Sequence, residues 1–363
     1  MLINMRAMLR RTHSVLISLA LLFLSAEFAP SAEPAAAVDE ITIAAVGDIM
    51  LGHRAEPYIV KEGPAYPFVN VMSVLRRAQL VIGNLESPIS TRGTAVENKQ
   101  FTLRVGPVAV AALKAAGIRV VTLANNHILD FGPQALQDTL TVLGENGILY
   151  SGAGMDLDDA RAPAILKVGG RTIAFLSYSL TFPLEFYASA GRPGTAPGYG
   201  EYVKKDIQKV RPVADLVVVS FHWGAELMTT AKAYQQDLGR RSIDWGADLV
   251  LGHHPHILQE LEVYRGRLIA YSLGNFVFGS ESDKTNASII LLCTFKGKSL
   301  ARVEAVPLDV NNYRVAYQPR VLTGSKADGL LAEINAASEK FKTRLTIRDG
   351  RGTMDLTAAG PGN

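Results

Sequence analysis

Cysteine is almost absent from this chain of 363 residues, which holds only Cys293, in the apolar run 289–293. One cysteine excludes an internal disulfide and any metal site built from several thiolates, so we expect Cys293 to be a packed core residue. An excess of one charge is also lacking, because 37 Lys and Arg against 34 Asp and Glu give a formal net charge of +3. This near-balance gives no general case for binding nucleic acid or a membrane surface.

The N-terminal apolar run is too short to span a bilayer comfortably. Residues 15–24 make up about half of the roughly 20 residues that a spanning helix needs. Basic residues precede this run and small residues follow it, at Arg6, Arg10, Arg11 and 35–37. The pattern predicts a secretory signal peptide over residues 1–37 and export to the periplasm or the cell exterior. The alternative is an uncleaved anchor that keeps the protein at the membrane.

Histidine, in contrast, is concentrated. Six of the seven histidines lie in four short motifs, each at the end of an apolar run. Histidine is the commonest neutral metal ligand and the usual general acid near neutral pH, so this concentration predicts a metal centre. The six residues are His53, His127, His222, His253, His254 and His256.

Strand-like and helical patterns alternate along the chain. Apolar, β-branched runs predict strands at 41–46, 80–82, 119–123, 172–178, 216–220, 249–251 and 268–273. Helical patterns lie between them at 69–78, 107–116, 133–145, 201–210 and 231–245. The alternation predicts an α/β fold with a parallel-rich sheet, in which ligand-binding residues gather beyond the carboxyl ends of the strands.

The domain organisation follows from the same patterns. We expect residues 38–310 to form one domain and residues 311–363 to form a C-terminal extension with one helix and a flexible tail. The stretch 181–200 has neither a helical nor a strand period and is rich in Gly, Pro, Tyr and Phe. We expect a long loop or a small excursion there, suited to cover the metal face.

Carboxylates and amides accompany the histidines. Asp48 follows a glycine at a strand end, which brings a hard oxygen ligand to a point of close backbone approach. Asn84 and Glu86 point the same way if the backbone stays extended, and Glu86 is suited to bridging two metals. The alternative for Glu86 is a turn with a salt bridge. Asn126 offers an amide oxygen as a ligand, while His127 stays free to protonate a leaving group.

The histidines differ in how strongly they point to a metal. His253, His254 and His256 place three imidazoles in four positions, which metal coordination rewards and packing does not. His222, taken alone, would be better explained as a buried, hydrogen-bonded residue than as a ligand. His53 is as consistent with an exposed loop residue as with a ligand.

These motifs together resemble those of the calcineurin-like metallophosphoesterases, and more closely those of the capsule-synthesis protein CapA, or poly-γ-glutamate biosynthesis, family. The resemblance runs from about residue 41 to residue 278, with the motifs in family order. The motifs are 47–52, 84–86, 123–127 with 130–132, 222–226, 252–256 and 271–276.

The resemblance implies a four-layer α/β/β/α sandwich with a dinuclear metal site. Asp48 resembles the first metal aspartate, and Glu86, or else Asn84, stands at the bridging position. Asn126 resembles the ligating asparagine, and His127 resembles the histidine that protonates the leaving group. His222, His254 and His256 resemble the histidine ligands that come late in the superfamily pattern, the last two with its His-x-His spacing. His253 is an extra histidine, and its use as a ligand would shift that spacing by one residue.

Three departures from the superfamily pattern concern the metals. Met50 stands where a histidine is usual, Asn84 where an aspartate is usual, and Ile128 where an acidic residue often follows, although Asp130 is close. The sequence therefore leaves open whether one of the two metal sites is weak, remodelled or absent.

The family implies a part in making, processing or exporting an anionic capsule polymer such as poly-γ-glutamate. We expect one or two divalent ions (manganese, iron or zinc, which the sequence does not distinguish) and an anionic polymer or a phosphoester as substrate. Lys99 and Arg104 suit an anionic substrate, or else carry solvated loop charge. Glu226 and Asn275, within the motifs, complete the candidate substrate-binding set.

Hydrolysis is one of several activities that this resemblance allows. The alternatives are a non-hydrolytic, metal-containing component of a capsule-synthesis or export complex at the membrane, a binding protein for anionic polymer, and a generic periplasmic phosphoesterase.

Overall fold

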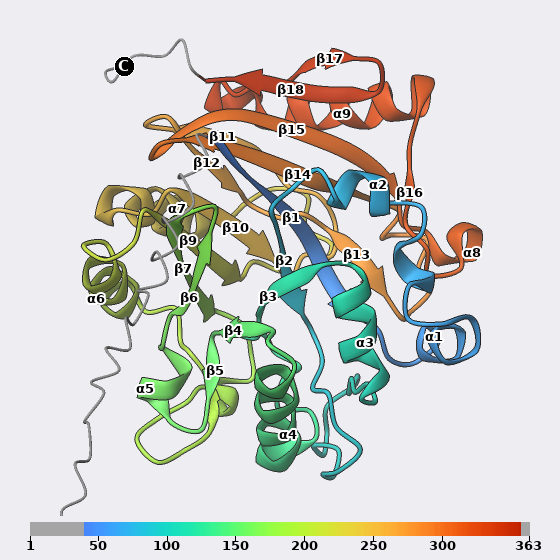
Figure 1. Cartoon of the computed structure of the whole chain (residues 1–363), viewed down its shortest axis with the longest axis vertical. Helices are drawn as coiled ribbons and strands as arrows, with labels where there is room; N and C mark the ends of the chain where they lie inside the picture. Colours follow the sequence, from blue (N-terminus) through green and yellow to red (C-terminus); the bar gives the residue numbers. More distant parts are fainter. Residues whose placement is uncertain (1–39, 357–363) are drawn as a thin grey trace, which may run out of the picture. The chain divides into compact units, whose positions relative to one another are not determined.

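The computed structural model describes residues 40–356 and shows a mixed α/β architecture built on two large sheets (Figure 1). The first sheet has 10 strands, the second has 6, and a pair of short strands stands apart from both. The expected signal peptide and His13 lie outside the described residues.

The first sheet has a parallel centre and an antiparallel flank. β1 to β4 run parallel to one another, and β14 lies antiparallel on the other side of β1. In spatial order the strands are β17 (Thr346–Arg348), β18 (Arg351–Asp355), β15 (Ser299–Asp309), β14 (Ala287–Lys296), β1 (Glu40–Met50), β2 (Leu80–Leu85), β3 (Ile118–Thr122) and β4 (Leu149–Ser151). Two further strands extend this sheet: β13 (Asn275–Phe278) pairs with β1, and β16 (Arg320–Val321) pairs with β15.

The second sheet also has a parallel centre. Its spatial order is β11 (Leu261–Tyr264), β12 (Arg267–Ala270), β10 (Leu249–His253), β9 (Leu216–His222), β7 (Arg171–Ser179) and β6 (Ala164–Val168). The strands β12, β10, β9 and β7 are parallel, and the two edge strands are antiparallel to their neighbours. The separate pair consists of β5 (Ala153–Gly154) and β8 (Gly194–Thr195).

Strand periodicity explains why the two sheets pack face to face. Successive side chains of a strand point to opposite faces, and in β1 Ile41 and Ile43 belong to the core between the sheets whereas Ala44 belongs to the core under the helices. Phe175 of β7 and Val218 of β9 meet that inner core from the second sheet.

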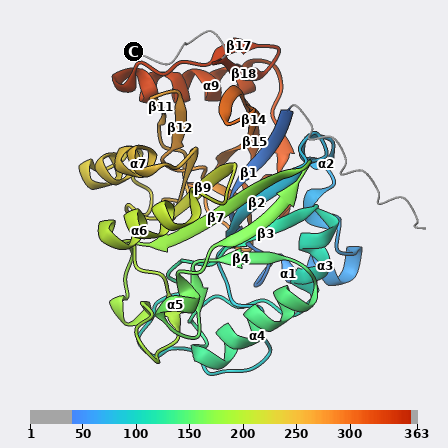
Figure 2. The ribbon, with the colours of Figure 1, turned by 60° about the vertical axis from the view of Figure 1, so that its left-hand side comes forward.

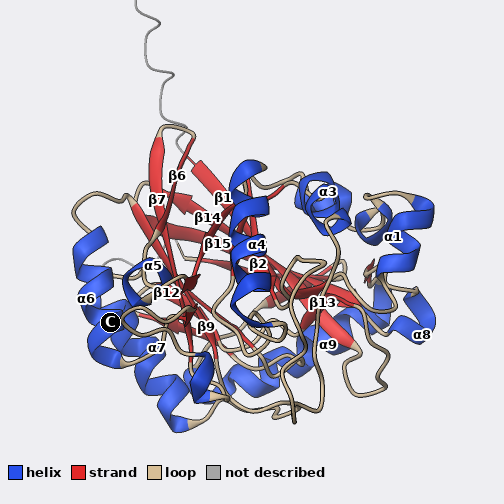
Figure 3. Ribbon diagram, turned by 90° about the horizontal axis from the view of Figure 1, so that it is seen from below, coloured by secondary structure: helices blue, strands red, loops and turns tan. Residues whose placement is uncertain are grey.

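Helices cover the two outer faces. One side carries α1 (Glu56–Glu62), α2 (Met72–Leu75), α3 (Val108–Ala115) and α4 (Gly132–Glu145), and the other carries α6 (Gly200–Val210) and α7 (Ala233–Trp245). Figures 2 and 3 show α3 and α6 on opposite sides of the sheets. One core lies between the first helical layer and the first sheet, a second between the two sheets, and a third between the second sheet and the other helical layer. The expected four-layer α/β/β/α sandwich is therefore confirmed.

The sequence patterns predicted most of these elements. All seven predicted strands overlap a strand of the structure, and the patterns at 107–116, 133–145, 201–210 and 231–245 match α3, α4, α6 and α7. The helix predicted at 69–78 is wrong in length, since only α2 is helical there. Past α2 the α-helical bonding pattern ends, because Arg77 N donates to Val74 O and Ala78 N to Leu75 O, each three residues back.

The C-terminal extension contributes more structure than the sequence suggested. The predicted helix is α9 (Gly324–Ser338), preceded by the short α8 (Asn312–Val315). Within the tail expected over residues 349–363, residues 351–355 instead form β18, which pairs with β15 and with β17. Of these elements, α9, β17 and β18 lie at the end of the sheets opposite the loops that follow β2 and β3 (Figure 1).

Within residues 40–356, no helix combines the length and the apolar character needed to cross a bilayer.

Candidate metal centre

The strand ends of the first sheet bring together an aspartate and two asparagines. Asp48 stands opposite Asn84 of β2 on one side and opposite Asn275 of β13 on the other. A side chain is not tolerated just before this aspartate, because a Cβ on Gly47 would lie 1.9 Å from the carbonyl oxygen of Gly274. Glycine therefore lets three backbones converge at this edge.

The second sheet supplies the histidines. His222 and His253 are the last residues of β9 and β10 and stand opposite each other in register. Beyond β10 the chain turns sharply, since His254 and His256 have φ of 95° and 60°, values that residues other than glycine rarely adopt. Backbone conformations of this kind cluster at functional sites. Here they belong to two residues whose rings face the carboxylates of the first sheet.

Glu86 is the centre of the cluster. Its side chain is fully buried, and within residues 40–356 its Oε1 atom has no hydrogen-bond partner. Three imidazole Nε2 atoms surround this oxygen, those of His222 at 3.5 Å, His256 at 3.8 Å and His127 at 4.0 Å. Burial, with the neighbouring Asp48 carboxylate, raises the pKa of Glu86 well above its ordinary value, so its ionised form calls for a cation.

Asp48 lies beside this group. Its Oδ2 atom is 3.2 Å from Nδ1 of His256, and its Oδ1 atom is 3.2 Å from Nδ1 of His253, the latter without good hydrogen-bond geometry. Burial opposes ionisation, but these two histidines hold the pKa of the Asp48 carboxyl well below its usual range.

The donor set fits divalent metals. Two groups of side chains have ligand atoms that lie within 4.8 Å of one another, and Glu86 belongs to both. The groups are Glu86, His254 and His256, and Asp48, Glu86 and His222. Metal–ligand bonds of about 2.0–2.2 Å separate tetrahedral ligand atoms by about 3.4 Å, close to the spacings around Glu86. Residues from both sheets therefore form one cluster of potential metal ligands, and Glu86 is the member that the two groups share.

The protonation of the buried histidines is mixed. Burial lowers the pKa of His254 to about 3 and that of His222 well below its ordinary value, so both are neutral and offer a lone pair. Burial also acts on His256, but the carboxylates of Glu86 and Asp48 raise its pKa to about 10. An ion at this position would take the place of the proton that His256 carries.

The hydrogen bonds of Asn84 bear on whether Glu86 or Asn84 is the bridging residue. The amide nitrogen of Asn84 donates to Oδ1 of Asp48 at 2.9 Å and to Oε2 of Glu86 at 3.3 Å. Its oxygen accepts from the amide of Asn125 at 3.1 Å. Because Asn84 presents a donor to the carboxylates, it orients them, and Glu86 is the better candidate for the bridge.

Asn126 joins the histidines. Its Oδ1 atom lies 2.7 Å from Nε2 of His222, which in turn lies 3.1 Å from Nδ1 of His254. Amide oxygen and imidazole nitrogens of this kind suit a borderline transition-metal ion. Asn126 Oδ1 would therefore be in place to act as a metal ligand beside His222.

His127 forms a separate pair with Asp130. Its Nδ1 atom lies 2.6 Å from Oδ2 of Asp130, which also accepts from the backbone of Leu103 at 2.6 Å. Lys99 bonds the other oxygen of Asp130 and the backbone oxygen of Asn126, and its Nζ lies 3.2 Å from Nδ1 of His127. Burial lowers the pKa of His127 despite Asp130, so the ring is neutral near pH 7.

Four of the candidate site residues lie outside the cluster or contact only its members. His53 is exposed, with its ring 3.1 Å from the carbonyl oxygen of Thr102, so the structure does not bring it to the metals. Arg104 stacks on the ring of Phe131 at 4.0 Å. Asn275 faces Nδ1 of His256 at 2.9 Å. Glu226 is exposed, in the loop held to the histidine segment by the bond from Leu227 N to Pro255 O.

The loop over residues 181–200 is more structured than expected. Leu184–Phe186 form a 3-10 turn, β8 pairs with β5, and Phe186 and Tyr187 are buried. The start of the loop is fixed beside the histidines, because Leu180 N donates to His222 O at 2.9 Å. Phe182 is 78% exposed, so its side chain is free to meet a ligand.

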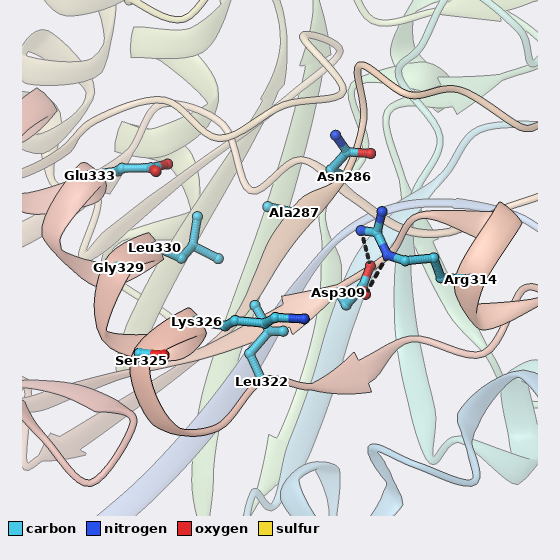
Figure 4. A pocket seen from close by; sticks show the side chains of 10 residues that line it. All are labelled: Asn286, Ala287, Asp309, Arg314, Leu322, Ser325, Lys326, Gly329, Leu330 and Glu333. Atoms are coloured by element: carbon cyan, nitrogen blue, oxygen red, sulfur yellow. Dashed lines mark hydrogen bonds and ion pairs between the residues drawn. The ribbon is translucent and has the colours of Figure 1, made fainter.

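A cavity of about 430 Å³ lies apart from these residues, between β15 and α9 (Figure 4). Lys326 and Leu330 line it, and Arg314 is already held by Asp309 through two bonds of 3.0 and 2.9 Å. No residue of the metal cluster lines this cavity.

Sequence reasoning missed the parts played by Asn125, Lys99 and Lys232. The sequence indicates only a turn at Asn125, although its side chain binds Asn84 and Leu85 O. Lys232 is exposed at the start of α7, and its positive charge is the smallest of several influences on the pKa of His254, which burial lowers most. The Asn-Asn-His motif was a signal for Asn125, whereas nothing local marks Lys232.

The match to a family model covers most of the described chain. Residues 42–280 match the family described as bacterial capsule synthesis protein PGA_cap. The chain is 33% identical over 320 residues to the PGA biosynthesis protein CapA of Bacillus subtilis (strain 168), covering 88% of this chain and 83% of that protein. It is also 33% identical over 279 residues to the capsule biosynthesis protein CapA of Bacillus anthracis, covering 75% and 68%.

Likeness to solved structures is remote. A 5'-nucleotidase precursor from Thermus thermophilus is 14% identical, with 76% of this chain and 55% of that chain covered and a TM-score of 0.46.

Proposed function

The chain belongs to the family of bacterial capsule synthesis proteins, and we propose that it is an exported, metal-dependent hydrolase acting on an anionic capsule polymer or its precursor. Poly-γ-glutamate is the polymer class that the name of the Bacillus subtilis relative suggests. Export is supported by the basic, apolar and small-residue order of residues 1–37.

One observation carries the hydrolase proposal. The Oε1 atom of Glu86 is buried, lacks a hydrogen bond among the described residues and is faced by Nε2 atoms of three histidines at 3.5–4.0 Å. A buried carboxylate among imidazoles is costly unless a cation joins it. Glu86, Asp48, His222, His254, His256 and Asn126 would hold the ions.

Divalent ions held there would supply Lewis-acid chemistry, which polarises a substrate oxygen and makes water a better nucleophile. The protein's own residues would position the reacting groups. Asn84 fixes the two carboxylates through its amide, and Asp130 holds the ring of His127 so that Nε2 faces Glu86. Because the neutral ring carries its proton on Nδ1, His127 Nε2 would first take a proton from the attacking water and would then pass it to the leaving group.

The test is hydrolysis by protein purified without chelator. We expect cleavage of a generic phosphodiester, or release of short chains from poly-γ-glutamate, which EDTA abolishes and which manganese or zinc restores. Metal binding without hydrolysis of either substrate would refute the hydrolase.

A non-hydrolytic, metal-containing polymer-binding component is the second candidate. The observation that favours it is Asn84, which stands where the superfamily pattern has an aspartate and donates hydrogen bonds to both carboxylates. This arrangement removes one negative charge from the metal set. Polymer binding that needs metal, with no cleavage, would support this candidate.

A further inference from the structure

Lys99 lies where three strand-end loops meet. It belongs to the loop after β2, and it bonds Asp130 and the backbone of Asn126, which follow β3. Its Nζ also lies 5.2 Å from the centre of the Phe186 ring, in the loop after β7. Its side chain is only 17% exposed. A lysine held in this way is poorly placed to be the solvated substrate ligand that its sequence position suggested.

The two oxygens of Asp130 have different partners. Oδ1 is bound by Lys99, whereas Oδ2 accepts from His127 Nδ1 and Leu103 N, each at 2.6 Å. A carboxylate held at both oxygens does not rotate about its Cβ–Cγ bond. Without the Lys99 ammonium, Oδ1 of Asp130 would be buried and would lack its charged partner. The carboxylate could then rotate to other partners, and this rotation would weaken the bond between Oδ2 and His127.

The position of the proton on His127 follows from its neighbours. A carboxylate only accepts hydrogen bonds, and an ammonium only donates them. Nδ1 lies 2.6 Å from Oδ2 of Asp130 and 3.2 Å from Nζ of Lys99, and this ammonium already donates to Asp130 Oδ1 and Asn126 O. The shorter contact therefore places the proton of the neutral ring on Nδ1, where it points to Oδ2. Nε2 then carries the lone pair and faces Glu86 Oε1 at 4.0 Å.

We propose that Lys99 is a positioning residue for His127: by holding Oδ1 of Asp130, it keeps Oδ2 on His127 Nδ1 and directs Nε2 toward Glu86. Lys99 itself touches neither the proposed ions nor the substrate. Its effect on catalysis rests on the proposed function, whereas its effect on the His127 ring does not.

The test compares Lys99→Met, Asp130→Asn and the double variant, with Lys114→Met as the control from an exposed lysine on α3. The single Lys99 variant leaves a buried carboxylate unpaired and is expected to lose stability, whereas the double variant removes both charges and keeps the fold. Urea unfolding checks both expectations.

Two readouts separate positioning from simple support of the fold. In metal-free protein, ring nitrogen NMR signals of His127, assigned by their loss in His127→Gln, should show one tautomer in the wild type and a mixture in Lys99→Met. In metal-loaded protein, kcat should fall at least about tenfold with KM changed less than about twofold. In the Asp130→Asn background, the Lys99 substitution should cost nothing further.

A single Nδ1–H tautomer retained in Lys99→Met would overturn the proposal, as would losses of kcat that multiply in the double variant. If the wild type hydrolyses no substrate, the proposed function fails, but the tautomer comparison still decides the role of Lys99.

Discussion

Glu86 and His222 face each other across two different sheets, with Oε1 of Glu86 3.5 Å from Nε2 of His222. Glu86 follows β2 of the first sheet, and His222 is the last residue of β9 in the second. The cluster therefore exists only when the sandwich is closed, so metal binding and folding are linked.

This linkage predicts a metal-dependent stability. An ion that binds only the folded state adds about 2.7 kcal/mol at a concentration of 100 times its Kd, which raises Tm by roughly 4 °C in a domain of this size. The measurement is thermal unfolding of chelator-treated protein with and without manganese or zinc. His222→Ala should abolish most of the shift, and an equal shift in both proteins would place the ions elsewhere.

His127 and His254 should differ as variants. His127→Ala should leave metal content nearly intact and cut hydrolysis roughly 100-fold or more, the scale of a general acid. His254→Ala should lower metal content as well, because its Nδ1 lies 3.1 Å from His222 Nε2 and its ligand atom converges with those of Glu86 and His256. Elemental analysis decides. Equal metal loss would make His127 a ligand instead of an acid.

An ion pair far from the metal cluster predicts how the stability of the fold depends on pH. Arg77 donates to both oxygens of Glu304 at 2.8 and 2.6 Å, and these bonds lower the pKa of Glu304. A depressed folded-state pKa gives stability that is present above the unfolded-state pKa of about 4.3 and is lost as pH falls through the folded-state value.

Urea unfolding at several pH values checks this sign. Wild type should exceed Glu304→Gln in unfolding free energy at pH 7, and the difference should shrink below about pH 4. A difference that grows on acidification would contradict the assignment.

Lys232 should contribute to holding an anionic polymer. It is exposed and acts electrostatically on His254, whereas Arg104 already stacks on Phe131 and donates to Arg92 O at 3.3 Å. Lys232→Glu should weaken poly-γ-glutamate binding more than Arg104→Glu, and added salt should reduce the difference. The measurement is binding of each variant at two salt concentrations. Equal binding throughout would remove the polymer from this face.

Local patterns predicted the strands and helices that carry the site. Period-two and apolar runs located β1, β9 and β10, and the position of Asp48, His222 and His253 at strand ends followed from this. Patterns did not reveal the antiparallel flank, because β18 pairs with β15 across some fifty residues of sequence and nothing local encodes that pairing.

The directions of loop side chains were the other gap. His53 turns to Thr102 O and Lys99 turns inward to Asp130, although both sit in loops beside candidate ligands. Which way such a residue faces depends on contacts with other loops, here Phe186 and Leu103, that come together only in the folded chain. Sequence spacing identified the metal face but not which of its charged residues point into it.

Anomalous X-ray scattering from crystals grown with manganese or zinc tests the central claim most directly. We predict one or two anomalous peaks about 2.0–2.2 Å from Glu86 Oε1, with His222 and His254 or His256 among the ligands, and their loss in Glu86→Gln. The matched control is Glu304→Gln, which removes a carboxylate held by Arg77 and should keep the same peaks as the wild type. Peaks only at other positions, or none at saturating metal, would contradict a metal centre at Glu86.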